Sequence, residues 1–104
     1  MFTTNKIYFS VSNIDDFVTK YNNHFDHLEI SYKCSSFKYD NKDFYNIALD
    51  FTVGKLSKDD FYKVLDDFCL INTKNSIKKA FYQYKNGLNE VKYVWNNKNI
   101  TLEK

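Results

Sequence analysis

The chain has 104 residues, 19% of them aromatic, which is enough to bury a core and too many for a disordered segment. Its formal net charge is only +2, but 72–104 holds seven lysines and two glutamates, whereas 1–71 is mildly acidic. The opening MFTTNKIYFSVS lacks the apolar region of a signal peptide, and no apolar run approaches the ~20 residues of a membrane span. We therefore expect one soluble, cytoplasmic domain over 1–104, with no membrane partner.

The first expected elements are a strand and a helix. In KIYFSV (6–11) apolar and polar side chains alternate, which is typical of a half-buried strand. In the following segment (12–25) apolar residues recur at helical spacing, and Ser12 or Asn13 is a suitable N-cap. The side chains predicted to face the core are Ile7, Phe9, Val11, Ile14, Phe17, Val18, Tyr21 and Phe25.

Two more strands and a second helix follow. The segments 27–35 and 44–53 alternate as strands do, and the polar residues 36–43 between them are typical of a turn. LSKDDFYKVLDDFCL indicates a helix that begins with a capping box from Ser57 and Asp60. The predicted inward side chains are Leu28, Ile30, Tyr32, Cys34, Tyr45, Ile47, Leu49, Phe51, Val53, Phe61, Val64, Leu65, Phe68 and Cys69.

The segment FYQYKNGLNEVKYVW allows two structures. In one, 75–86 is a helix capped by Gly87, with Leu88 making the apolar contact that follows such caps. In the other, Asn86 and Gly87 form the turn of a β-hairpin, 77–95, in which Lys85 pairs with Leu88. The Asn-Gly pair and the strand-forming Tyr and Val residues favour the hairpin. Its two faces would carry Ala80, Tyr82, Tyr84, Val91, Tyr93 and Trp95 on one side, and Lys79, Gln83, Lys85, Glu90 and Lys92 with the misfits Phe81, Leu88 and Val94 on the other.

These elements follow the β-α-β-β-α-β order of the ferredoxin-like split. We therefore expect an α+β fold in which an antiparallel sheet has two helices packed on one face. The last segment, NITLEK (99–104), would add an extra C-terminal hairpin strand. The predicted core consists of Phe9, Phe17, Leu49, Phe51, Phe61, Leu65 and Phe68.

Few residues suit catalysis or metal binding. His24 and His27 flank a carboxylate, but they straddle a helix end and a strand start, so their side chains should diverge. Cys34 and Cys69 continue apolar stripes and are expected to be core hydrophobes without a neighbouring base. The glycines of a phosphate-binding loop are absent from the sequence. We therefore expect no enzymatic activity, no metal and no cofactor.

A binding surface is the remaining hypothesis. The helices and the first three strands already supply many apolar side chains, so some rings of the 77–95 hairpin should be surplus and reach the surface. Lysine stems could reach round the hairpin edge to join them, and two rings that point outward from the first and third strands are suited to stacking. The predicted binding residues are Tyr82, Tyr84, Tyr93, Trp95, Lys79, Lys85, Lys92, Tyr8 and Phe44.

Two kinds of partner fit such a surface. Aromatic anchors among charged residues suit a protein or ribonucleoprotein partner. The chain is similar in size and AT-biased composition to phage and mobile-element antagonists of host defence, anti-CRISPR proteins among them. That similarity implies an inhibitor of a defence or nucleic-acid-processing complex. The alternative is a domain that binds RNA or single-stranded nucleic acid without sequence preference, since the chain has no arginine for bidentate readout of guanine.

Overall fold

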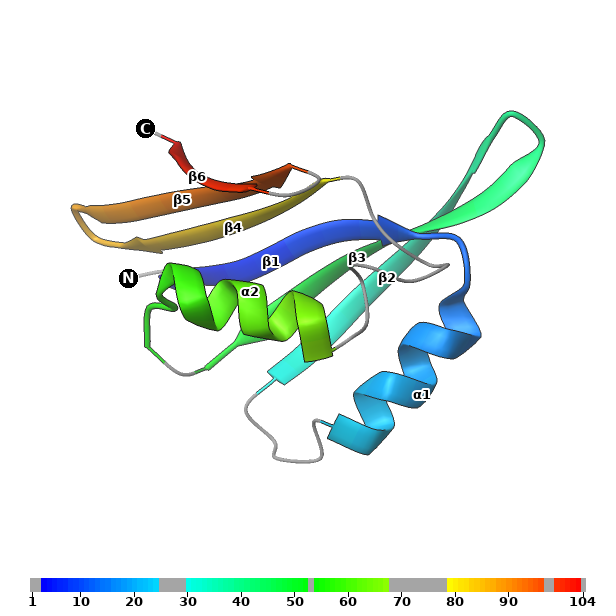
Figure 1. The fold of residues 1–104 in the computed structure, drawn as a ribbon, viewed down its shortest axis with the longest axis horizontal. Coiled ribbons are helices and arrows are strands. Elements are labelled where there is room, and N and C mark those ends of the chain that lie inside the picture. Colours follow the sequence, from blue (N-terminus) through cyan, green and yellow to red (C-terminus); the bar gives the residue numbers. More distant parts are fainter. Residues whose placement is uncertain (1–2, 25–29, 53, 68–78, 97–98, 104) are drawn as a thin grey trace.

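The computed structural model describes residues 3–24, 30–52, 54–67, 79–96 and 99–103, with only the backbone for His24 and 99–103. In these ranges the chain forms six strands and two helices, in the order expected from the sequence (Figure 1). They are β1 (Thr3–Val11), α1 (Ile14–His24), β2 (Ile30–Tyr39), β3 (Lys42–Phe51), α2 (Lys58–Asp67), β4 (Lys79–Asn86), β5 (Asn89–Asn96) and β6 (Asn99–Glu103).

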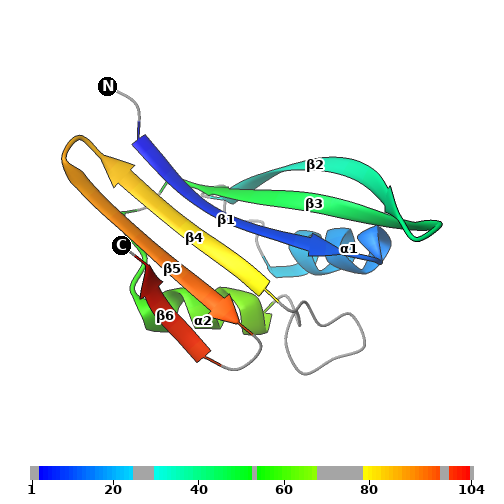
Figure 2. The same cartoon turned by 90° about the horizontal axis from the view of Figure 1, so that it is seen from above.

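All six strands belong to one antiparallel sheet with the order β2-β3-β1-β4-β5-β6. β3 lies between β1 and β2, and β1 lies between β3 and β4. Both helices cover the same face of the sheet, and none of the described elements lies on the other face, which we call the open face (Figures 1 and 2). The protein is therefore a small α+β domain with an antiparallel sheet and two helices, as predicted. None of the helices in the described ranges is long and apolar enough to cross a membrane.

The β2–β3 hairpin is longer than the sequence indicated. Instead of a polar turn over 36–43, the strands continue to Tyr39 and Lys42, which pair with each other. The loop consists of Asp40 and Asn41 alone, with φ of 54° and 63°. Two consecutive left-handed residues give the type I′ geometry whose twist matches the flanking strands, and Asp and Asn tolerate it better than most residues.

The β4–β5 hairpin confirms the hairpin interpretation over the helical one, but its register differs from the prediction. Lys85 pairs with Glu90 rather than Leu88, so the two-residue loop is Gly87-Leu88 instead of Asn86-Gly87. Gly87 has φ of 63°, as the first residue of a type II′ loop requires. The shift is two residues, an even number, so the predicted division of side chains between the two faces is retained.

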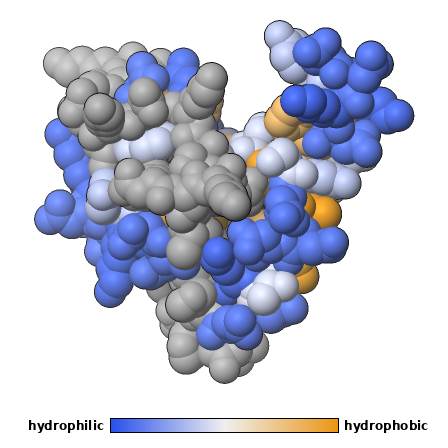
Figure 3. Space-filling view, turned by 45° about the vertical axis from the view of Figure 1, so that its right-hand side comes forward, coloured by the Kyte–Doolittle hydropathy of each residue, from blue (hydrophilic) through white to orange (hydrophobic). Residues whose placement is uncertain are grey.

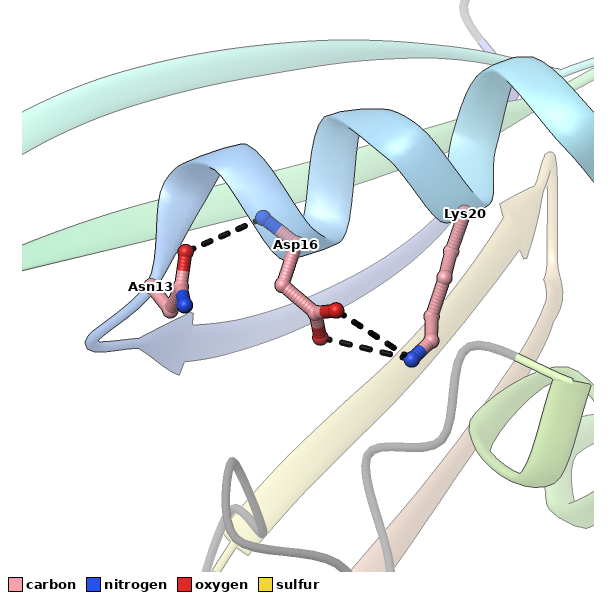
Figure 4. A network of polar contacts seen from close by, with 3 residues as sticks. All are labelled: Asn13, Asp16 and Lys20. Carbon is pink, nitrogen blue, oxygen red and sulfur yellow. Dashed lines mark hydrogen bonds and ion pairs between the residues drawn. The ribbon is translucent and has the colours of Figure 1, made fainter.

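Both helices begin at the predicted capping residues. At α1, Asn13 Oδ1 accepts a hydrogen bond of 3.0 Å from the backbone N–H of Asp16, and the Asp16 carboxylate lies 3.4 Å from Lys20 Nζ one turn later (Figure 4). At α2, Ser57 Oγ accepts from the Asp60 N–H at 3.1 Å, and Asp60 Oδ2 accepts from the Ser57 N–H at 3.2 Å. This reciprocal pair is a capping box with Asp in the place of Glu.

The core lies between the sheet and the two helices. Six of its seven predicted members are buried in one cluster: Phe9, Phe17, Leu49, Phe51, Phe61 and Leu65. Other predicted inward residues lie outside the described ranges, namely Phe25, Leu28, Val53, Phe68 and Cys69. Cys34 is exposed, contrary to prediction. β2 is an edge strand, and α1 contacts it at Ile30, whose carbonyl accepts a hydrogen bond of 2.6 Å from the Tyr21 hydroxyl, and at Tyr32, whose ring packs on Phe17 at 5.1 Å between centroids.

Candidate functional site

Most of the predicted aromatic patch is core. Tyr82, Tyr93 and Trp95 are only 1%, 8% and 4% exposed, so the expectation that these rings are surplus is wrong. The sheet brings β4 and β5 over α2, where Phe61 fills the space beneath them. The Tyr82 and Tyr93 rings stack at 5.5 Å between centroids, and the Phe61 ring lies 6.1 Å from each. Tyr84 is half-buried at the margin of the core.

The buried hydroxyl of Tyr82 serves the fold. It donates a hydrogen bond of 2.6 Å to Asn5 Oδ1 and accepts one of 2.9 Å from the Leu56 N–H. Asn5 Nδ2 donates to the Gly54 carbonyl at 3.1 Å, so β1, β4 and the β3–α2 loop are joined through polar groups. Burial raises the pKa of Tyr82 to about 12, which keeps the phenol protonated as a donor. Sequence reasoning missed Asn5, although the alternation of β1 places it on the inward side with Ile7.

The open face of the sheet carries a different row of side chains. Tyr8 of β1 pairs with Ala48 of β3 on one side and with Phe81 of β4 on the other, and Phe81 pairs with Val94 of β5. The Phe81 ring is 41% exposed and Tyr8 is partly exposed. We call Tyr8 and Phe81 the central rings. Phe81 interrupts the polar side of its strand, and this break in alternation is its signal in the sequence, although the pattern alone marks it only as a misfit.

Lysines surround the central rings. Lys79 Nζ lies 5.1 Å from the centroid of the Phe81 ring, within cation–π range. Lys33 of β2 pairs with Ala48 of β3, which is itself the neighbour of Tyr8. Lys6 lies two residues before Tyr8 in β1 and therefore on the same face of the sheet. The side chains here line a hollow of about 710 Å³, to which Tyr8, Ser10, Lys33, Asn46, Lys79 and Phe81 contribute. Figure 3 shows the hollow beside the rising β2–β3 hairpin, with less hydrophilic side chains within it.

The two layers of the molecule differ in charge. Among the described residues, strand alternation places these charged side chains on the open face: Lys6, Lys33, Lys42, Lys79, Lys85 and Lys92, with Asp50 and Glu90. The helices carry Asp15, Asp16, Asp59, Asp60, Asp66 and Asp67, with Lys20, Lys58 and Lys63. Lysines therefore predominate on the open face and carboxylates on the helical layer, an arrangement that orients a polyanion toward the sheet.

The predicted binding residues are thus only partly brought together. Tyr8 and Lys79 lie at the centre of the open face. Lys85 and Lys92 lie further along β4 and β5, and Lys92 Nζ is 3.6 Å from the Glu90 carboxylate. Phe44 lies apart, stacked on Phe37 near the β2–β3 turn.

The described residues offer little for metal or acid–base chemistry. His24 ends α1, and His27 lies outside the described ranges. Where the structure is described, no cluster of His, Cys, Asp and Glu side chains is suited to holding a metal ion. The open face, by contrast, offers aromatic and cationic contact.

No protein family model, curated protein or solved structure matches this chain.

Proposed function

We propose that the protein binds single-stranded nucleic acid on the open face of its sheet, without sequence preference. The observation that carries the proposal is the pair of central rings, Tyr8 and Phe81, side by side on adjacent strands and flanked by lysines. Bases of any sequence have a π-face that stacks on such rings, and lysines neutralise the phosphates between them. The hollow around the rings gives the bases a concave surface to enter.

The side chains of the open face favour binding without recognition of base sequence. Lysine offers phosphate a point charge but lacks the planar fork that reads guanine, and the chain has no arginine. Asp50 would repel a phosphate, but it lies opposite Lys6 in the β1–β3 pairing, which offsets its charge. The acidic helices on the far side disfavour wrapping of the strand, so the bound segment should be confined to the sheet.

The experiment is fluorescence anisotropy with labelled dT12 and rU12 at low salt. Phe81→Ala should weaken binding about 5- to 160-fold, because stacking on one ring contributes about 1–3 kcal/mol. Lys79→Gln should reduce the slope of log K against log salt by about 0.7. The matched controls are Tyr62→Ala and Lys63→Gln, which remove an exposed ring and a lysine from α2. Wild-type protein that binds neither oligonucleotide, or Phe81→Ala that binds as well as wild type, contradicts the proposal.

A second candidate is the protein-binding function expected from the sequence, as an inhibitor of a host-defence or nucleic-acid-processing complex. Three of its four aromatic anchors are buried, which weakens it. One observation favours it: Leu88 at the β4–β5 turn is fully exposed, beside a hollow of about 430 Å³ that Tyr84 and Val91 help to line. An exposed leucine next to a tyrosine is suited to anchoring in a protein pocket.

The anti-CRISPR form of this candidate has a direct test. Cells with an active CRISPR nuclease should become permissive to a targeted phage when they make the protein, and Leu88→Ser should abolish the effect. Plaque formation that stays blocked in the presence of wild-type protein would exclude that form.

We also infer that β1, α1, β2, β3, α2 and β4 form a ferredoxin-like unit, extended by β5 and β6. Two features support this inference. Each helix connects two strands that flank a third, and both helices cover one face of the sheet. An experimental structure in which β2 or β4 occupied another position in the sheet would refute it.

A further inference from the structure

The β2–β3 hairpin extends beyond the helical layer as an arm, which we define as residues 35–46. Figure 1 shows its turn standing clear of both helices. One aromatic residue of the arm, Tyr45, faces the helices and packs against the core. The other three lie on the opposite face: Phe37, Tyr39 and Phe44. None of these three belongs to the buried core cluster, and Phe37 and Tyr39 are 37% and 70% exposed.

The three rings of the arm lie on the same side as the central rings. Along β3, Phe44 alternates with Asn46 and Ala48, and Ala48 is the neighbour of Tyr8. Along β2, Phe37 is the partner of Phe44, and Tyr39 follows it on the same face. The arm therefore continues the open face of the sheet and presents its rings to the same side of the molecule.

The rings of the arm form a small stacked group. The Phe37 and Phe44 rings stack with centroids 5.6 Å apart, and the Tyr39 ring meets Phe44 edge-on at 6.5 Å. A cross-strand aromatic pair stabilises a hairpin and accounts for Phe37 and Phe44. It does not account for Tyr39, which remains largely exposed, with Lys42 as its strand partner.

The two groups of rings are separated by a polar row. Phe44 and Ala48 lie four positions apart on β3, a distance of about 13 Å along an extended strand. Between them lies Asn46, which pairs with Ser35 and whose Oδ1 accepts a hydrogen bond of 2.7 Å from Ser10 Oγ. Stacked bases in one strand repeat every ~3.4 Å, so no single base reaches both groups, whereas about five consecutive nucleotides span the gap.

We propose that the arm is a second base-stacking site, and that one nucleic-acid strand crosses the open face from Phe81 to Tyr39. This inference rests on the proposed function and adds to it a minimum length of ligand. A trinucleotide engages one group of rings at a time. A strand of about eight nucleotides or more engages both, and its affinity gains from the second contact because that contact is intramolecular. Lys42 beside Tyr39 supplies a phosphate contact at the outer end.

The test compares short and long probes on wild-type protein and on the double variant Phe37→Ala/Tyr39→Ala. The probes are dT3, followed by NMR titration, and labelled dT12 and rU12, followed by anisotropy. The double variant should bind both dodecamers at least about tenfold more weakly, whereas its affinity for dT3 should change by no more than about twofold. Tyr62→Ala, which removes a ring from α2, should leave all three affinities unchanged.

Tyr39→Ala alone keeps the inference testable if the double variant melts early, because this side chain is 70% exposed and contributes little to the fold. It should still weaken dodecamer binding while the melting temperature stays near wild type. If Tyr39→Ala and the double variant both bind the dodecamers as tightly as wild type, the arm is not a stacking site. The site at the central rings would not be affected by that result. If wild-type protein binds none of the probes, the proposed function is wrong, and so is the arm site that rests on it.

Discussion

The two long hairpins of this sheet have similar aromatic content, but they differ in how much of it is buried. In β4–β5, Tyr82, Tyr93 and Trp95 are buried over α2, whereas in β2–β3 the rings of Phe37 and Tyr39 remain in contact with solvent. Both hairpins close with two-residue loops and both pair along most of their length. What separates them is the face on which the rings lie: the buried rings of β4–β5 point toward the helical layer, whereas Phe37 and Tyr39 lie on the open face. The comparison indicates that burial of a ring follows from the neighbouring layer rather than from its own strand.

The largest effect is expected when part of the helical layer beneath β4–β5 is removed. Phe61→Ala deletes the buried ring on which Tyr82 and Tyr93 pack, so the free energy of unfolding should fall by about 3–5 kcal/mol. The matched change in the other hairpin, Phe37→Ala, should cost less than about 1 kcal/mol, because that ring is already partly solvated. Urea denaturation of both variants measures the difference. Equal losses would show that the arm is as much a part of the core as the β4–β5 hairpin.

The comparison predicts a pH effect that involves only the buried hairpin. Because the pKa of Tyr82 rises from 10.0 to about 12 on folding, its protonated form stabilises the protein fully below pH 10. That contribution, about 2–3 kcal/mol, should be lost as the pH rises from about 10 to about 12, since the unfolded chain releases the proton first. Unfolding free energies measured across this range should fall more steeply in wild type than in Tyr82→Phe. Parallel pH profiles would show that the phenol is not responsible.

The smallest expected effect lies at the end of the arm. Tyr39→Ala should change the free energy of unfolding by no more than about 0.5 kcal/mol, because the ring is 70% exposed and lies outside the core cluster. Thermal melting of this variant beside wild type provides the measurement. A drop of several degrees would mean that the ring stabilises the hairpin, and the case for a ligand contact there would weaken.

The sequence predicted the elements well because their signals are local. Alternation located β1 and β3, helical spacing located α1 and α2, and the helices begin at Asn13 and Ser57 as capping chemistry requires. Even the wrong register of β4–β5 kept the correct faces, because the shift was an even number of residues.

The candidate site was harder to predict, because exposure depends on which layer covers which strand. A count of apolar residues predicts surplus rings in β4–β5, but it does not reveal that α2 lies beneath Tyr82 and Tyr93. The same limitation made Cys34 look buried, although its strand lies at the edge of the sheet. Phe81 was visible in the sequence as a ring on the polar side of a strand. A break in alternation of this kind is the signal that could have identified the central rings.

The hydrogen bond between Tyr82 and Asn5 joins residues 77 positions apart, and it has a consequence for how the chain reaches its native state. β1 is synthesised first, yet both of its sheet partners, β3 and β4, come much later, so the middle of the sheet has high contact order. Such topologies fold slowly, on a scale of milliseconds to seconds, because distant segments must meet before their pairing is rewarded. We expect a nascent chain to remain open until Tyr82 leaves the ribosome, and limited proteolysis of stalled chains on either side of that length would detect the change.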